Sequence, residues 1–252
     1  MLRRARAFGG ARQRSSSVLI FGDSNTWGYN PKPRLVPRRL PDGDRWPDLL
    51  EQSMNAAANE GEEIVRIHVD ALNARTTVFA DPTGPCDGEY DCSGRSTFMT
   101  ALHAHKPLDA VVIALGTNDL KRQINLGPEQ VVAGVKILCK DVERATDIGK
   151  VVKDEKGEQL NGPCPEIIVV GVPKVLETPV SLAWGFEGAT QKSERTAAMT
   201  KQMADASGFL FVDQQQIPVS PLDGVHFDKD SQPAIAAAVE VGLKKALAKR
   251  RG

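Results

Sequence analysis

The sequence has no excess of charge of either sign, because its 252 residues carry 32 basic and 32 acidic side chains. That balance argues against a dedicated nucleic-acid-binding protein, since the phosphate backbone demands a basic surface. Long hydrophobic runs are also missing: the longest, around 110–115 and 167–172, fall far below the roughly 18 residues that a membrane-spanning helix needs. The sequence therefore predicts no nucleic-acid partner and no membrane span.

Cysteine is scarce as well, with four residues at Cys86, Cys92, Cys139 and Cys164. They form no CxxC pair and have no nearby histidine, so the pattern predicts no zinc site. Cys86 and Cys92 flank a loop rich in glycine and aspartate, and they would be placed for a small disulfide in an oxidising compartment. Reduced thiols are the default interpretation.

Residues 1–17 differ in composition from the rest of the chain. They contain five arginines and no acidic residue, namely Arg3, Arg4, Arg6, Arg12 and Arg14. Such a leader is typical of an organellar transit peptide, which would place the protein in a mitochondrial or other organelle matrix. A disordered tail, or a start codon assigned too far upstream, explains it equally well and would leave the protein cytoplasmic. In each case we expect the leader to lie outside the fold.

Short apolar runs alternate with helix-like segments along the rest of the chain. The runs that predict strands are 17–21, 64–69, 110–115, 166–172 and 209–212. The segments that predict helices are 46–59, 95–105, 128–145, 190–206 and 232–249. Strands that alternate with helices of this length imply a mostly parallel sheet with helices on both faces. We therefore expect one α/β domain over 18–252, a three-layer α/β/α sandwich, with 30–44 and 149–165 as surface loops.

The first predicted strand leads directly into the sequence GDSNTWG at 22–28. In a parallel sheet the working groups collect at the carboxyl ends of the strands, which places Ser24 at that edge. Serine is a weak nucleophile unless a base takes its proton, so a histidine is required. Asp23, beside it, is interpreted as a structural hydrogen-bonding residue in preference to a second base.

His226 is the best candidate for that base. Asp223 precedes it by three residues, so a tight turn would let the carboxylate hold the imidazole and favour the imidazolium that forms during catalysis. The other histidines fit less well, because His103 and His105 lie on different faces of a predicted helix and His68 lies inside a predicted strand. The sequence thus predicts Ser24, Asp223 and His226 as a catalytic triad.

A second group of residues could stabilise an oxyanion. Asn118 follows the third predicted strand and offers a side-chain amide at the same edge of the sheet. Together with the backbone N–H of Ser24 it would hold a developing negative charge, at roughly 3–4 kcal/mol per donor. A further donor could come from the turn at 71–77, which follows the second strand.

Taken in order, these motifs resemble those of the SGNH hydrolases, also called GDSL-like esterases and lipases. Ser24 matches the first block of that family, Asn118 the third, and Asp223 with His226 the last, and the resemblance covers nearly all of 18–250. It implies the flavodoxin-like form of the α/β fold with five strands. The second block departs from the pattern, because Asn73-Ala74 stands where the family usually has a glycine. Alanine keeps the N–H of the oxyanion hole, provided that the backbone does not require a positive φ.

The opening DSNTWG and the ARTT sequence at 74–77 are similar to a narrower branch, the bacterial arylesterases and acyltransferases. That resemblance implies hydrolysis of short-chain esters, transfer of the acyl group to alcohols, and assembly into homo-oligomers. Trp27 matches a tryptophan near the active-site mouth of that branch, so Trp27 and Asn73 become candidate substrate-binding residues. The plain alternative for Trp27 is a core aromatic.

The predicted reaction is acyl transfer through a covalent intermediate on Ser24, with a small-molecule ester as substrate and neither metal nor cofactor required. Two other functions stay open. One is a deacetylase for acetylated carbohydrate, because the same constellation serves sugar esters in related families. The other is a catalytically silent member that binds an acyl or sugar ligand, although losing any one of the four positions would have sufficed to silence it.

Overall fold

The computed structural model describes residues 15–32, 38–58, 63–83, 90–149, 152–153, 158–160 and 162–251. Its centre is a five-stranded sheet in the order β2-β1-β3-β6-β7, in which every neighbouring pair is parallel. The strands are β1 (Ser15–Gly22), β2 (Ile64–Ala71), β3 (Ala110–Ala114), β6 (Glu166–Val170) and β7 (Leu210–Val212). This order is that of flavodoxin-like sheets. The predicted α/β sandwich is confirmed, with a sheet that is parallel throughout.

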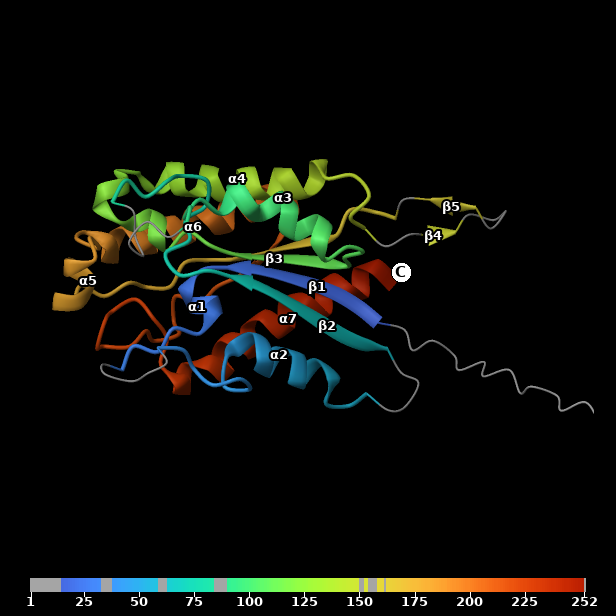
Figure 1. Ribbon diagram of the computed structural model, residues 1–252, viewed down its shortest axis with the longest axis horizontal. Helices are drawn as coiled ribbons and strands as arrows, with labels where there is room; N and C mark the ends of the chain where they lie inside the picture. The colour runs from blue at the N-terminus through green and yellow to red at the C-terminus, as the bar shows by residue number, and fades with distance from the viewer. Residues whose placement is uncertain are drawn as a thin grey trace, which may run out of the picture.

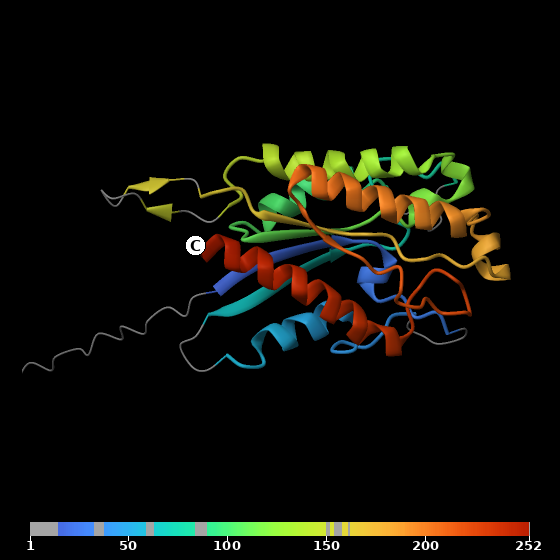
Figure 2. The same cartoon turned by 180° about the vertical axis from the view of Figure 1, so that it is seen from behind.

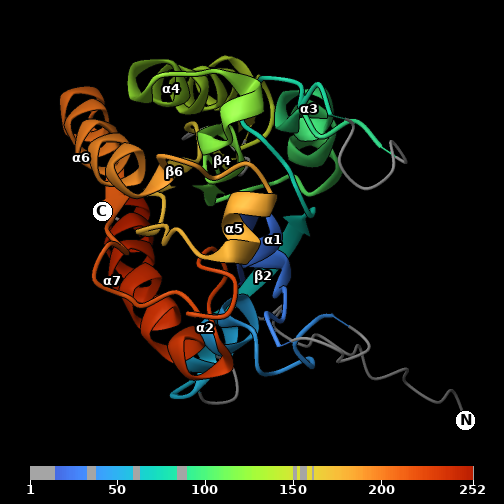
Figure 3. The same ribbon diagram turned by 90° about the vertical axis from the view of Figure 1, so that its left-hand side faces the viewer.

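Helices cover both faces of the sheet (Figures 1 and 2). One face carries α2 (Trp46–Asn55) and α7 (Gln232–Arg251), and the other carries α3 (Gly94–Ala104), α4 (Pro128–Arg144) and α6 (Ala189–Ser207). The shorter elements are α1 (Ser24–Trp27), η2 (Asn118–Leu120), η3 (Arg122–Ile124), α5 (Pro179–Ala183) and η4 (Lys229–Ser231). Viewed from the carboxyl end of the sheet, α1 and α5 overlap in front of it (Figure 3), and Figure 1 shows that α5 lies farther from the sheet than α1.

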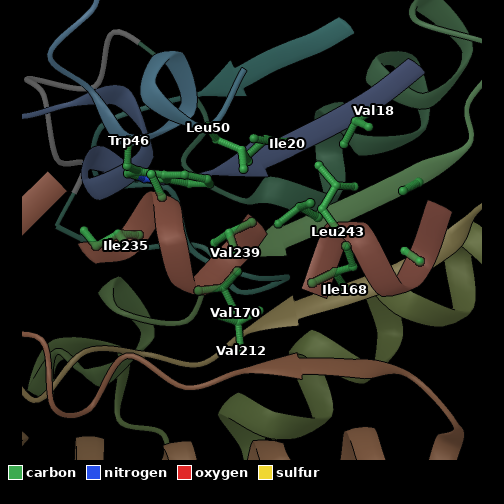
Figure 4. Close-up of a cluster of buried hydrophobic side chains, with 14 of the residues drawn as sticks. Val18, Ile20, Trp46, Leu50, Ile168, Val170, Val212, Ile235, Val239 and Leu243 are labelled. Carbon is green, nitrogen blue, oxygen red and sulfur yellow. The ribbon is translucent and has the colours of Figure 1, made fainter. Parts of the chain in front are cut away.

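The side chains of the central strands β1, β3 and β6 alternate between two hydrophobic clusters, as the pleat of a strand dictates. Val18 and Ile20 of β1 pack toward α2 and α7, where Trp46 and Leu243 complete the cluster (Figure 4). The intervening Leu19 and Phe21 pack into the cluster beneath α3, α4 and α6. Because both faces of β1 are buried, the strand reads in the sequence as a continuous apolar run.

The beginning of the chain and one loop differ from the sequence predictions. β1 begins at Ser15, which pairs with Ile64 of β2, so the last three residues of the predicted leader belong to the sheet. Residues 1–14 lie outside the described residues. The predicted loop 149–165 contains a small antiparallel pair, β4 (Val152–Lys153) and β5 (Gln159–Leu160). Two-residue strands carry too little hydrophobic pattern to be recognised in a sequence.

Some predictions fall on parts of the chain that are not described. Cys86 lies outside the described residues, so a disulfide to Cys92 stays a prediction. In the described part of the other predicted loop, 30–32 and 38–44, the backbone forms one isolated bridge between Tyr29 and Arg39.

Within the described ranges, no helix combines the length and the apolar character needed to cross a bilayer. No group of three or more metal-ligating side chains lies close together there either.

Candidate active site

The segment that carries Ser24 is a tight turn from β1 into α1. Asp23 caps the helix, since its Oδ1 accepts the N–H of Asn25 at 2.9 Å. The turn demands glycine before it, because a Cβ on Gly22 would lie 2.1 Å from Oγ1 of Thr26. It therefore presents Ser24 at the carboxyl end of the sheet, where only 6% of the residue is exposed.

The structure brings Ser24, His226 and Asp223 together from opposite ends of the chain. Ser24 Oγ lies 2.8 Å from Nε2 of His226, and Nδ1 of the same ring lies 2.8 Å from Oδ2 of Asp223. The nitrogen that faces the carboxylate carries the ring proton, which leaves Nε2 to accept the hydroxyl proton of Ser24. All three residues are at least nine-tenths buried. The arrangement is that of a serine nucleophile, a general base and an orienting carboxylate.

A tight turn fixes the geometry of Asp223 and His226. Gly224 between them has φ of 76°, and a Cβ there would lie 2.1 Å from the carbonyl oxygen of Leu176. Oδ1 of Asp223 accepts the backbone N–H groups of Val225 and His226, each at 2.9 Å. Burial alone would raise the pKa of Asp223, but the hydrogen bonds from His226 and Val225 outweigh it and hold that pKa below its ordinary value. The carboxylate thus stays charged opposite the imidazole.

Asn25 ties the nucleophile segment directly to this turn. Its Nδ2 donates to the carbonyl of Val225 at 3.3 Å, and its Oδ1 accepts the N–H of Phe227 at 3.3 Å. Both bonds flank His226 and span about 200 positions of sequence. We infer that Asn25, next to Ser24, sets the distance between the hydroxyl and the imidazole; the sequence carries no signal of this role.

The turn after β2 lies beside Asn118 and is held there by buried polar groups. The guanidinium of Arg75 donates to the carbonyls of Gly22 and Asp70 at the ends of β1 and β2. Nδ2 of Asn118 donates one proton to the carbonyl of Arg75 at 3.1 Å, which leaves its second amide proton for another acceptor. Ala74 has φ of 59°, a left-handed conformation that favours glycine. The sequence prediction of an Ala74 donor assumed that no positive φ is required here, and that assumption is wrong. Alanine nevertheless adopts the left-handed conformation, at a steric cost, and Ala74 keeps its N–H and lines the cavity.

A cavity of about 380 Å³ opens over these groups. Its lining includes Ser24, Ala74, Asn118 and His226, so the predicted oxyanion donors and the predicted nucleophile face one space. The other lining residues are Tyr29, Asn73, Thr83, Lys121, Gln123, Trp184, Phe186 and Val225. The volume suits a small ligand.

The comparisons with known proteins agree with this geometry. A model of the GDSL-like lipase/acylhydrolase family matches residues 20–233, which is most of the chain. The chain belongs to this family. It is therefore an esterase of the SGNH type, as the motifs suggested.

Solved structures of related hydrolases share its fold over nearly their whole length. A carbohydrate acetylesterase family member from Sinorhizobium meliloti is 30% identical, with a TM-score of 0.76 and coverage of 92% of this chain and 99% of that one. The aryl esterase of M. smegmatis is 28% identical, with a TM-score of 0.76 and coverage of 92% and 100%. The comparison with curated protein sequences gave no match.

Within this SGNH esterase, the two predicted substrate-binding residues are placed differently. Asn73 lines the cavity, whereas Trp27 does not: the guanidinium of Arg39 lies 4.8 Å from the centroid of its ring. The cavity aromatic from this segment is Tyr29, two positions later. The left-handed Gly28, with φ of 88°, redirects the chain between the two rings, and the sequence alone does not reveal which of them enters the cavity.

The wall of the esterase cavity includes Lys121, which forms an ion pair with Asp81 behind it. Nζ of Lys121 lies 3.4 Å from Oδ2 of Asp81, and both side chains are buried. Burial would raise the pKa of Asp81, but hydrogen bonds from Thr83 and the charge of Lys121 lower it below its ordinary value. Lys121 follows η2 directly. Its position just after the Asn118 motif is the sequence signal from which it could have been predicted as a cavity residue.

Proposed function

We propose that this SGNH esterase hydrolyses short-chain aryl and alkyl carboxylic esters through an acyl-serine intermediate. The observation that carries the proposal is the continuous hydrogen-bonded series from Ser24 Oγ through His226 to Asp223, with both links at 2.8 Å. Such a series prepares the hydroxyl for attack before substrate arrives, because the base already accepts a hydrogen bond from it. The intact series argues against a silent binding protein.

In the proposed first step, Ser24 Oγ attacks the ester carbonyl while Nε2 of His226 takes the hydroxyl proton. The bond to the leaving alkoxide then breaks, and the imidazolium returns its proton to that oxygen, so the alcohol departs neutral. Water attacks the acyl-serine in the second step, with His226 again acting as base and then protonating Ser24 Oγ. Asp223 orients the imidazole and stabilises its charged form throughout.

The negative charge of each tetrahedral intermediate would be held by three donors. These are the backbone N–H groups of Ser24 and Ala74 and the free amide proton of Asn118. All three residues line the cavity, and the bond from Asn118 to the carbonyl of Arg75 fixes the amide next to Ala74. None of these steps requires a metal ion or cofactor.

The size of the cavity supports a short acyl chain or a small aryl alcohol, and its aromatic wall of Tyr29, Trp184 and Phe186 suits apolar groups. An alcohol that enters in place of water would accept the acyl group by the same chemistry. We therefore include acyl transfer to alcohols in the proposal. Acyl transfer is measured by adding an alcohol to the assay and determining the ratio of newly formed ester to free acid.

The test of the nucleophile is hydrolysis of p-nitrophenyl acetate by the wild type, by Ser24→Ala and by Ser96→Ala. Ser96 is an exposed serine on α3 and serves as the matched control. We expect Ser24→Ala to lose at least about 10³-fold in kcat, since the triad acts as a unit, and Ser96→Ala to retain full activity. Equal rates for the wild type and a folded Ser24→Ala protein would remove Ser24 from the mechanism. Labelling of Ser24 by a fluorophosphonate probe is the complementary measurement.

A carbohydrate deacetylase is the second candidate, and one feature of the cavity favours it. Buried Oδ1 of Asn73 has no hydrogen-bond partner among the described residues. Thr83, Lys121 and Gln123 line the same cavity and would bind hydroxyl groups. Turnover on acetylated xylan compared with small aryl acetates separates the two: a preference of tenfold or more in kcat/KM for the sugar ester would replace the first proposal by the second.

A further inference from the structure

Two aromatic side chains pack against the imidazole of His226, the proposed general base. The ring of Tyr29 stacks on the imidazole of His226, with centroids 4.1 Å apart and an angle of 27° between the planes. The indole of Trp184 meets the same imidazole at 5.8 Å and 72°, and it meets Tyr29 at 6.3 Å and 90°. One face of the imidazole is therefore covered by a phenol ring, and an indole lies against its side.

The backbone that places Ser24 also places Tyr29. The N–H of Tyr29 donates to the carbonyl of Ser24 at 2.9 Å, and the left-handed Gly28 turns the chain so that the ring points back over the site. Nη1 of Arg38 donates to the hydroxyl of Tyr29 at 2.9 Å and anchors the far end of the ring. The nucleophile and the ring that covers its base thus lie on one short segment.

An aromatic face carries a partial negative charge and attracts a cation placed above it within about 6 Å. The imidazole lies well inside that limit, and it becomes cationic each time it takes the proton of Ser24. We propose that Tyr29 is a positioning residue that holds the imidazole of His226 in register with Ser24 and stabilises its protonated form through the ring face. The inference rests on the proposed function, because it assigns the stacked ring to the base of that reaction.

Other charges act on the same imidazole and must be kept constant in a test. Asp223 pairs with Nδ1, the buried carboxyl of Asp23 lies close enough to interact electrostatically with the ring, and Lys121 lines the same cavity. Arg38 reaches the site only through the hydroxyl of Tyr29.

Replacing Tyr29 by Phe or by Leu leaves Asp223, Asp23 and Lys121 in place. Both variants also lose the hydrogen bond from Arg38. The Phe variant keeps the ring face, and the Leu variant loses it while retaining much of the apolar volume. The comparison of the two variants therefore isolates the ring face.

The direct measurement is the pH titration of the His226 ring by ¹⁵N NMR, with the signal assigned by its loss in His226→Gln. We expect the midpoint of the His226 titration in Tyr29→Phe to lie within about 0.2 pH unit of the wild type. In Tyr29→Leu we expect the midpoint to lie about 0.4–0.7 unit lower, because the protonated ring loses its aromatic partner. If Tyr29→Leu fails to fold, Tyr29→Met provides a flexible replacement of similar size.

The kinetic measurement is the pH profile of kcat/KM with p-nitrophenyl acetate. In Tyr29→Leu the acidic limb of the profile should move to lower pH by the same amount as the NMR titration, and kcat at the plateau should fall roughly threefold. In Tyr29→Phe the acidic limb and kcat should both match the wild type. An unchanged or upward-shifted titration in Tyr29→Leu, or a Phe variant that behaves like Leu, would overturn the inference. The NMR titration needs no turnover, so an inactive protein with the expected shift would refute the esterase proposal and leave the role of Tyr29 standing.

Discussion

At the scale of single residues, the carboxyls of Asp23 and Asp119 are the unusual groups beneath the nucleophile. Burial raises the pKa of Asp23 to about 6, because it is offset only in part by the hydrogen bonds from Asn25 and Thr117 and by the nearby charges of His226 and Arg75. Burial likewise raises the pKa of Asp119 to about 6, against three hydrogen bonds from Thr77, and the charge of Asp23 adds to the rise.

A raised carboxyl pKa makes the folded state less stable as the pH rises. Between the ordinary value of 3.8 and about 6, folded Asp23 holds a proton that the unfolded chain has released. The free energy of unfolding therefore falls across this window and stays reduced above it, by about 3 kcal/mol for a two-unit shift. Asp23→Asn removes this dependence, so its stability relative to the wild type should rise by about 2–3 kcal/mol between pH 4.5 and pH 7.5.

Urea unfolding followed by circular dichroism at several pH values measures that difference. Asp205→Asn is the matched control, because the carboxylate of Asp205 is exposed on α6 and pairs with Lys201. The control should keep the pH dependence of stability that Asp23 gives to the wild type. A difference between Asp23→Asn and the wild type that does not vary with pH would mean that Asp23 does not hold its proton in the folded protein.

The residues show where prediction from sequence succeeds and where it stops. The spacing of Ser24, Asn118 and His226 along the chain was enough to propose a shared site, because parallel strands bring their carboxyl ends to one edge. The sequence analysis chose Trp27, whereas the aromatic residue that lines the cavity is Tyr29. The sequence could not decide between the two, because the outcome depends on the backbone angles of Gly28. Asn25 was equally hidden, because its two partners lie about 200 residues away.

At the scale of elements, the turn that carries Asp223 and His226 depends on Gly224. Its φ of 76° and the carbonyl of Leu176, 2.1 Å from an added Cβ, leave no room for a side chain. We expect Gly224→Ala to lower the free energy of unfolding by at least about 3 kcal/mol, as the sum of backbone strain and overpacking. Since the turn must move, kcat for p-nitrophenyl acetate should fall by more than tenfold in the protein that remains folded.

Gly188 at the start of α6 provides a control for the strain alone. Its φ of 72° is nearly the same, yet an added Cβ there would meet nothing within 4 Å. Gly188→Ala should therefore cost about 1 kcal/mol and leave kcat unchanged. If the two variants lost the same free energy of unfolding, the contact with the carbonyl of Leu176 would make no contribution to the loss in Gly224→Ala.

The long elements were predictable for a physical reason that the short ones lack. α4 and α7 are several turns long, so their apolar positions repeat often enough to define a face, and the buried strands stand out as apolar runs. The four residues of α1 and the five of α5 form barely more than one turn each. Their position follows from caps and from contacts with distant residues, which a local pattern does not contain.

At the scale of the whole molecule, the two hydrophobic clusters share the same strands. Leu243 of α7 is fully buried in one cluster and Leu138 of α4 in the other, and neighbouring residues of β1 and β3 contribute to both. Loss of packing on one face therefore exposes strands that the other face needs. This sharing predicts that the α/β domain, from β1 to α7, unfolds as a single cooperative unit.

Differential scanning calorimetry of Leu243→Ala and Leu138→Ala tests that cooperativity. Each truncation should cost about 2–5 kcal/mol, and at about 2–4 °C per kcal/mol for a chain of this size each should lower Tm by about 5–15 °C. We expect one transition in the wild type and in both variants, with calorimetric and van't Hoff enthalpies that agree. If Leu243→Ala split the transition in two, the face formed by α2 and α7 would be a separate unit. The triad, with Ser24 after β1 and His226 before α7, would then depend on the docking of two units instead of on one fold.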